Sequence, residues 1–193
     1  MLRLSVRGVR VQISLLFPAA VVWLCSRDQS GTAALCLYAS LWHELGHLLA
    51  LYLFHLRPTC LTFGAFGLRL SIPETLSCRQ HRVLALAGPA FNLVAVTLLW
   101  AFFRSRAAAP HLLLAAFNLL PVQPLDGGQA LYFALWPRFG DRIAGTVLAV
   151  TSAAVVIPLT AAAVWVLWRS GYNGSLLLVC GYLVLLLTLK KRG

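Results

Sequence analysis

Apolar stretches long enough to cross a lipid bilayer follow one another along this chain, and this pattern limits what it can fold into. A transmembrane helix takes about 20 mostly apolar residues, or fewer where flanking side chains reach the interface. Six stretches qualify, the fourth being short and interrupted by prolines and polar residues: about 11–25, 32–56, 83–103, 111–125, 143–168 and 172–189. The sequence therefore predicts an all-α polytopic membrane protein with about six transmembrane helices, in a single domain covering residues 1–193.

The composition argues against an ordinary soluble domain. Hydrophobic residues make up 60% of the 193 residues and charged residues only 11%, against about 45–50% apolar and about 25% charged in soluble domains. A soluble helical domain must cover its outside with polar side chains, and this chain has too few of them.

The chain is strongly basic, with a formal net charge of +11. Its basic residues lie between the apolar stretches rather than along one helical face, which fits the positive-inside rule better than a nucleic-acid surface. All but four of the 16 Lys and Arg residues would fall on one side of the membrane. We therefore expect a multi-pass protein of the cell membrane with both termini cytoplasmic and no nucleic-acid partner. The first stretch follows three arginines without a clean cleavage site, so we expect it to be retained rather than removed as a signal peptide.

The five cysteines are scattered along the chain and form no C-x-x-C pair: Cys25, Cys36, Cys60, Cys78 and Cys180. Neither a disulfide framework nor a thiolate zinc site is indicated. Buried small hydrophobic side chains are the simpler interpretation.

Two stretches break the helical pattern. Residues 58–73 have short apolar arms around Gly64 and Gly67, a pattern that fits a β-hairpin and a plain cytoplasmic loop about equally well. The hydrophobicity of the stretch favours the hairpin, associated with the membrane surface. Residues 119–128 contain two prolines and a Gly-Gly pair, which exclude a continuous helix. At membrane depth such backbone is tolerated only against protein or around a watery cavity, so this broken fourth segment is a candidate site.

The run His43-Glu44-Leu45-Gly46-His47 lies inside the second apolar stretch. Residues four apart share one face of a helix, so the imidazoles of His43 and His47 can reach a single cation. Glu44 is one position along and can hold a water molecule on that cation without being a ligand. This H-E-x-x-H pattern is typical of zinc proteases, in which the glutamate is the general base.

A structural cluster of polar side chains that holds helices together is the alternative explanation of this run. A charged or titratable group near the bilayer centre costs about 2.5–3.5 kcal/mol on insertion scales, so such groups usually mark functional sites. Three titratable groups within five residues of an apolar helix therefore favour a metal site.

A catalytic zinc site needs a third protein ligand and leaves one position open. Besides Glu44, the chain has four acidic residues, and three of them fall in predicted polar loops: Asp28, Glu74 and Asp141. Asp126 ends an apolar, irregular stretch that runs in the same direction as the second stretch. It is therefore expected in the cytoplasmic half of the membrane, with His43 and His47. The remaining histidines lie too far along the helix or beside loops: His55, His81 and His111.

These residues resemble the site-2 protease family of intramembrane metalloproteases. The pattern N-x-x-P-x-x-P-x-D-G at residues 118–127 is long and specific, and Gly88-Pro89-Ala90-Phe91-Asn92 matches a third family element, G-P-x-x-N. The resemblance covers about residues 35–130, within a three-helix catalytic core predicted over about 32–130. The predicted plan is closest to the sporulation branch, which activates a sigma-factor precursor, although the CBS domain usual in that branch is missing from the sequence.

The resemblance implies a zinc endopeptidase that cleaves its substrate within or near a membrane segment. Zn²⁺ would be held by His43, His47 and Asp126, with Glu44 as the base. Substrate-binding roles are implied for Asn92 and for the loop residues Gly64, Phe66 and Gly67. For Asn92 a hydrogen bond between membrane helices is an equal alternative. The implied partners are a membrane-associated protein substrate, the lipid bilayer and a membrane regulator.

Two other functions remain compatible with these residues. A metal-binding membrane transporter or scaffold would use the same histidine and aspartate ligands but would not need Glu44. An inactive relative that only holds membrane partners would not need zinc at all.

Overall fold

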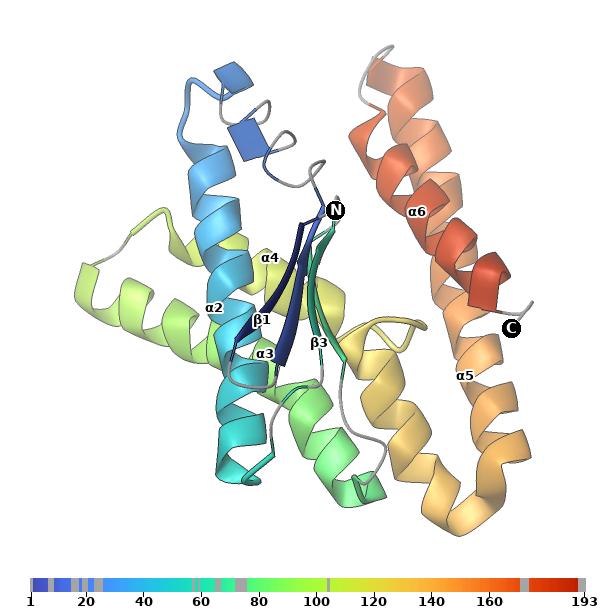
Figure 1. Cartoon of the computed structure of the whole chain (residues 1–193). Helices are drawn as coiled ribbons and strands as arrows, with labels where there is room; N and C mark the ends of the chain where they lie inside the picture. The colour runs from blue at the N-terminus through green and yellow to red at the C-terminus, as the bar shows by residue number, and fades with distance from the viewer. Residues whose placement is uncertain are drawn as a thin grey trace. The chain divides into compact units, whose positions relative to one another are not determined.

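A computed structural model describes residues 2–6, 9–14, 18, 21–22, 26–56, 58, 60–64, 67–71, 76–103, 105–170 and 174–190. It divides into two compact units, Met1–Ala116 and Phe117–Gly193, and each unit is described by itself. Figure 1 shows the helices and strands of both, with labels on most of them.

The first unit contains a four-stranded sheet in the order β1-β2-β3-β4. The strands are β1 (Leu2–Val6), β2 (Val9–Ile13), β3 (Cys60–Gly64) and β4 (Gly67–Ser71). Strands β1 and β2 are antiparallel, β2 and β3 are parallel, and β3 and β4 are antiparallel with Gly64 opposite Gly67. Of the hairpin and the plain loop considered for residues 58–73, the structure therefore has paired strands over Cys60–Gly64 and Gly67–Ser71.

The prediction that a transmembrane helix begins at residue 11 is wrong. Residues 9–13 form strand β2, paired on both sides. The local sequence Val-Arg-Val-Gln-Ile alternates apolar and polar side chains, which is the period of a strand rather than a helix. Most of the rest of that predicted span, up to residue 25, lies outside the described residues.

Three long helices lie in the described part of the first unit, and α2 packs on α3 (Figure 1). They are α2 (Thr32–Leu53), α3 (Cys78–Leu98), which continues as a π-helical turn η1 (Leu99–Phe103), and α4 (Ala108–Asn118), whose last two residues belong to the second unit. Where α2 ends, His55 adopts a positive φ of 56°, and the next amide, of Leu56, donates to the carbonyl of Leu51. This is a Schellman C-cap, and it gives His55 a local structural role.

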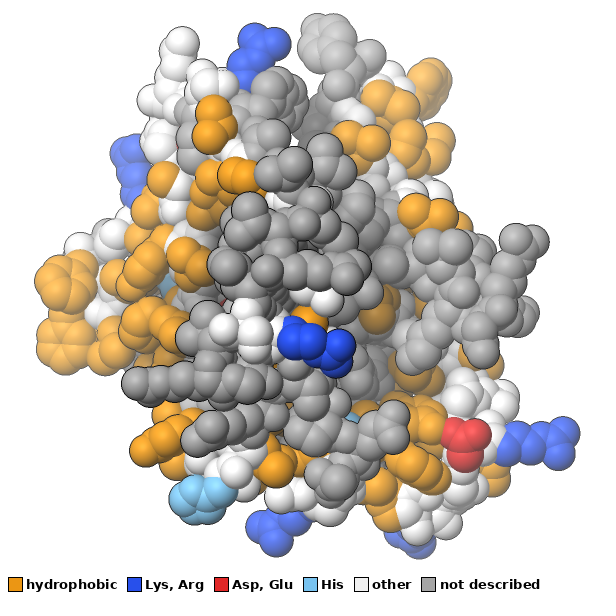
Figure 2. Space-filling view, viewed as in Figure 1, with side chains coloured by type: hydrophobic (Ala, Val, Ile, Leu, Met, Phe, Trp, Pro, Cys, Tyr) orange, Lys and Arg blue, Asp and Glu red, His pale blue; other side chains and the backbone are white. Residues whose placement is uncertain are grey.

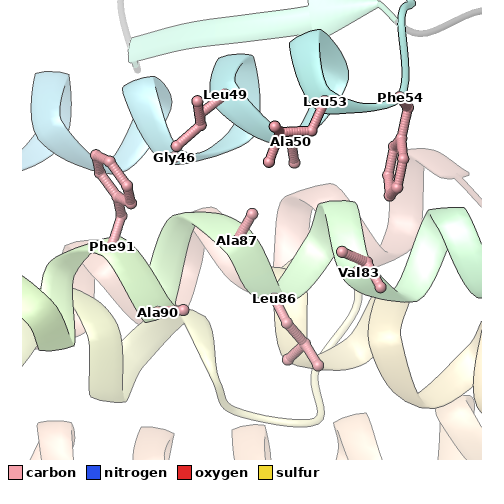
Figure 3. Close-up of a pocket in the computed structure, with 10 residues that line it drawn as sticks. All are labelled: Gly46, Leu49, Ala50, Leu53, Phe54, Val83, Leu86, Ala87, Ala90 and Phe91. Atoms are coloured by element: carbon pink, nitrogen blue, oxygen red, sulfur yellow. The ribbon is translucent and has the colours of Figure 1, made fainter.

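Helices α2 and α3 approach each other closely at Gly46. A Cβ added there would lie 2.6 Å from the carbonyl oxygen of Ala87 and 2.7 Å from Cβ of Phe91. Trp42 reinforces the contact, because its indole N–H donates to the carbonyl of Phe91 at 3.0 Å and its ring stacks on that of Phe91. Beyond Gly46 the two helices border an apolar groove of about 380 Å³ (Figure 3).

Gly46→Ala is expected to destabilise the first unit. The new methyl group meets backbone of α3, which cannot rotate away, and overpacking of this kind costs about 1–3 kcal/mol. The midpoint of thermal unfolding in detergent should therefore fall. Gly145→Ala is the control, because nothing lies within 4 Å of its added Cβ; helix propensity alone should leave that variant equally or more stable. An unchanged midpoint for Gly46→Ala would show that the helices do not approach this closely.

The second unit is built from α5 (Asp126–Ser170) and α6 (Ser175–Lys190), which pack on each other (Figure 1). Gly140 has a positive φ of 78° and divides α5 into two helical parts. The core of this unit joins the irregular segment before α5 to both helices through Val122, Val156 and Leu183.

Two helices among the described residues are long and apolar enough to cross a membrane, Cys78–Phe103 and Asp126–Ser170. Only 33% and 22% of their most apolar windows are buried inside the protein, whereas a core helix of a soluble protein is mostly buried. Hydrophobic side chains predominate among the described ones on the face in Figure 2. The exposed apolar residues include large aromatic ones, such as Trp100, Phe102 and Trp168.

Candidate metal centre

The two histidines of the H-E-x-x-H run meet on one face of α2, as their spacing predicted. Their Nε2 atoms are 3.2 Å apart, and the ring planes stand at 80° to each other. Two nitrogens bound to one tetrahedral zinc ion at about 2.0–2.1 Å would be separated by about 3.3 Å. His43 is buried and His47 half-buried, so the pair fits a metal ion without large rearrangement.

The Nδ1 atoms of both rings have partners on α3. Nδ1 of His47 lies 2.8 Å from the carbonyl oxygen of Leu84 on α3 and can only donate to it. Nδ1 of His43 lies 3.1 Å from the carboxamide of Asn92, also on α3. Such partners orient the ligand rings in metal sites, and here they leave both Nε2 atoms on the side where the rings converge.

Gly88 forms the floor of this converging space. A Cβ added at Gly88 would lie 2.5 Å from Nε2 of His47 and 2.6 Å from Nε2 of His43. The absence of a side chain at this position therefore leaves open the place that a metal ion on both nitrogens needs. Gly88 belongs to the G-P-x-x-N element, and its position explains why this element needs a glycine there.

His111 is a site residue that the sequence analysis missed, because it was placed beside a loop. It lies inside α4, is 0% exposed, and its Nδ1 is 2.9 Å from the carboxamide oxygen of Asn92. Asn92 is itself fully buried. A single imidazole in an otherwise apolar helix was the signal that could have found it.

Glu44 follows His43 on α2 and is half-buried. A carboxylate at this position is adjacent in the chain to one of the two converging imidazoles, as the H-E-x-x-H pattern requires of a general base.

In the second unit Asp126 is the first residue of α5 and is half-buried. The segment before it is tightly folded: the amides of Val122 and Leu125 donate to the carbonyls of Leu120 and Val122, each at 2.8 Å, and the Gln123–Pro124 bond is cis. A Cβ on Gly128 would lie 2.5 Å from the carbonyl oxygen of Val122. The two glycines after Asp126 thus let the broken segment fold back against the start of α5.

Ser152 fixes this segment from the middle of α5. Its hydroxyl, on a side chain that is 1% exposed, accepts the amide of Gln123 at 3.0 Å. Ser152→Ala leaves that amide without its partner, which costs about 1–3 kcal/mol when the group is buried. Thermal unfolding in detergent should show the loss. Thr151→Ala is the matched control, since the Thr151 hydroxyl donates to the carbonyl of Leu148 in its own helix; equal losses in the two variants would contradict the anchoring role.

The other acidic residues have different neighbours. Asp28 accepts hydrogen bonds from the Ser30 hydroxyl and the Ala33 amide at the start of α2, and these hold the pKa of Asp28 below its usual value. Asp141 accepts a hydrogen bond from the hydroxyl of Tyr132, and Glu74 lies outside the described residues.

Of the expected substrate contacts, Gly64 and Gly67 face each other at the end of the β3–β4 pair, while Phe66 lies outside the described residues. The four cysteines that the structure describes are free thiols.

Comparison with known proteins gives relatives of one kind. No family model matches the chain. A candidate zinc metalloprotease of Mycobacterium tuberculosis, Rip3, is 32% identical over 158 residues, which cover 72% of this chain and 39% of the relative. A candidate zinc metalloprotease of Synechocystis is 33% identical over 131 residues, 60% of this chain and 34% of that protein. The chain thus spans less than half the length of these relatives.

The fold has a counterpart among solved structures. The site-2 protease from Methanocaldococcus jannaschii matches with a TM-score of 0.65 over 94% of this chain and 91% of that one, at 18% sequence identity. At this identity the likeness concerns the fold alone.

Proposed function

We propose that the chain, which is related to candidate zinc metalloproteases over 72% of its length and has the fold of a site-2 protease, is a zinc endopeptidase of the site-2 protease family that acts on a membrane-associated protein. In this proposal it hydrolyses a peptide bond in or near a membrane segment of the substrate. One observation carries most of the weight: two imidazole nitrogens 3.2 Å apart converge over Gly88, beside a glutamate on the same helix.

Zinc is the metal that suits this donor set. Catalytic zinc sites take imidazole nitrogen and carboxylate oxygen from three protein ligands and keep the fourth position for water. His43 and His47 supply two nitrogens whose other ring positions are already hydrogen-bonded. The described cysteines have no part in the pair, so thiolate coordination is not needed to explain it.

Asp126 is the third ligand in this proposal. The other acidic residues that the structure describes are engaged elsewhere or serve as the base, and Asp126 stands at the start of a helix behind a tightly folded segment. Because hydrogen bonds hold the segment before Asp126, the backbone that carries its carboxylate has little freedom to move. A carboxylate restricted in this way loses less conformational entropy when it binds a metal. The fourth position is left for water and substrate.

Glu44 carries the proton transfers. Zinc bound at this site would act as a Lewis acid, which makes a water molecule more acidic and polarises the substrate carbonyl. The Glu44 carboxylate accepts a proton from the attacking water and returns it to the nitrogen of the leaving amine. No other acidic side chain precedes or follows the two histidines on α2.

The proposed setting is the cell membrane, crossed several times, with both termini cytoplasmic as the distribution of Lys and Arg indicates. A transmembrane substrate satisfies its backbone hydrogen bonds internally and must unwind before cleavage. Strand β4 has a neighbour on one side only in the described sheet, so an unwound segment could pair with it as an added strand. Gly64, Phe66 and Gly67 would then contact the substrate, for which a sigma-factor precursor is one candidate.

Removal of zinc tests the proposal. Purified protein in mild detergent is mixed with candidate membrane-anchored proteins, and the products are identified by mass spectrometry. We expect cleavage in or next to a membrane segment that stops after treatment with a zinc chelator and returns when about one equivalent of zinc is added. Cleavage that survives complete removal of the metal would overturn the proposal.

A further inference from the structure

The buried side chains behind His43 form one hydrogen-bonded chain. Asn92 on α3 and His111 on α4 are both 0% exposed. The carboxamide of Asn92 lies between two imidazoles, 3.1 Å from Nδ1 of His43 and 2.9 Å from Nδ1 of His111. The chain therefore leads from a metal-binding ring into the interior of the first unit.

The position of one proton decides whether His43 can bind a metal. Histidine binds through an unprotonated nitrogen, and the hydrogen bond of the other nitrogen sets which tautomer is present. His47 meets this condition, because its Nδ1 donates to the carbonyl of Leu84. For His43, Nδ1 must likewise carry the proton, and the Asn92 carboxamide must turn its oxygen toward that proton.

Turning the oxygen of Asn92 toward His43 places its amide nitrogen against His111. Nδ1 of His111 can accept from that amide only when the ring carries its proton on Nε2. Nε2 of His111 is buried and without a hydrogen-bond partner among the described residues. Among the described residues, Asn92 is therefore the hydrogen-bond partner that sets the tautomer of the His111 ring.

In the structure the nitrogen of Asn92 faces His43 and the oxygen faces His111. A half-turn of the carboxamide, with a change of tautomer in His111, gives the arrangement that binds metal. The ring of Tyr38 makes a T-shaped contact with the ring of His111, with the ring planes at 80° and the centroids 5.4 Å apart. This contact holds the His111 ring in place. A leucine could fill this place without a buried unpaired nitrogen, so the distinctive contribution of the imidazole is its bond to Asn92.

We propose that His111 is a positioning residue for the metal centre. In the arrangement that binds metal, after the half-turn of the carboxamide, His111 accepts the amide proton of Asn92, which holds the carboxamide oxygen on His43 and leaves Nε2 of His43 unprotonated. This inference rests on the proposed zinc site, and it assigns the carboxamide of Asn92 to holding a ligand.

Asparagine and glutamine carry the same carboxamide on side chains of different length, so the two substitutions at His111 test its hydrogen bond to Asn92. In His111→Asn the side-chain oxygen occupies nearly the place of Nδ1 and can still accept from Asn92. In His111→Gln the longer side chain carries its polar end to the place of Nε2, away from Asn92. If the protein needed only a buried polar group at residue 111, the two variants would bind zinc equally well.

Zinc affinity of the full-length protein in detergent, measured by competition with a chelator of known affinity, gives the readout. We expect His111→Leu and His111→Gln to weaken binding by about 10–100-fold, the usual effect of losing a partner behind a metal ligand. His111→Asn should stay close to wild type. Wild-type affinity in both His111→Leu and His111→Gln, or an equal loss in His111→Asn and His111→Gln, would overturn the inference. The Asn–Gln comparison decides the matter even if His111→Leu does not fold.

A double variant shows whether the two residues act in series. Asn92→Leu should weaken zinc binding, and adding His111→Leu should weaken it no further, because the bond to Asn92 is already gone. Additive losses of zinc affinity would show that His111 does not act through Asn92. His47→Ala separates this inference from the proposed function: zinc binding that survives His47→Ala removes the zinc site and the inference with it. Binding lost in His47→Ala but kept in His111→Gln removes the inference alone.

Discussion

Replacing Gly88 with alanine is expected to abolish tight zinc binding while leaving the helices folded. The added methyl group would lie 2.5 Å from Nε2 of His47 and 2.6 Å from Nε2 of His43, so it takes the space between both ligands and an ion. We expect affinity to fall by more than about 100-fold, which exceeds the usual loss from a residue behind a ligand. The nearest atoms are ends of imidazole rings, which can rotate aside, so α3 itself need not move.

Metal analysis of the purified variant, together with its thermal unfolding without zinc, checks this result. Gly181→Ala on α6 is a suitable control, since nothing lies within 4 Å of its added Cβ. It should bind zinc as the wild type does. Wild-type zinc content in Gly88→Ala would mean that the ion does not sit between the two histidines.

Replacing Glu44 with glutamine is expected to abolish hydrolysis while zinc remains bound. Glutamine keeps the size of the side chain but cannot accept the proton of the attacking water at neutral pH. General acid–base groups contribute about 10²–10⁴-fold to rates, or about 3–5 kcal/mol in the barrier. Cleavage of an identified substrate under single-turnover conditions measures the effect, and metal analysis of the same preparation establishes that the site is loaded.

This variant also separates the protease from its rivals. A metal-binding transporter or scaffold would use the two histidines but lose nothing when Glu44 becomes glutamine. Substrate processing at the wild-type rate in Glu44→Gln would therefore end the protease proposal. His47→Ala is the companion control, because it should lose both the metal and the cleavage.

The pairing of His43 with His47 could be predicted from sequence because it depends only on helix geometry. Four residues make about one turn, so both rings had to share a face once α2 formed. The place of Gly88 between them, and of His111 behind Asn92, could not be predicted in this way. Both depend on how α2, α3 and α4 pack, and no local spacing encodes that packing.

The sheet shows a different limit. Val9 to Ile13 alternates in the period of a strand, yet the arginines before an apolar run favoured a membrane span. The pairing that stabilises the strand comes from far along the chain, since β2 lies parallel to β3 with Val11 opposite Leu61. A long-range partner of this kind leaves no mark in the strand's own sequence, so periodicity was the only usable signal.

The spectrum of the bound metal tests the central claim most directly. X-ray absorption at the zinc edge of the purified wild type should show about one zinc per chain. Its shell should contain only nitrogen and oxygen, at about 2.0–2.2 Å, with the scattering pattern of two imidazoles. The same measurement on Asp126→Ala should show that shell weakened or the zinc lost. A sulfur shell at about 2.3 Å, or an unaltered spectrum in both Asp126→Ala and His47→Ala, would contradict a site made of His43, His47 and Asp126.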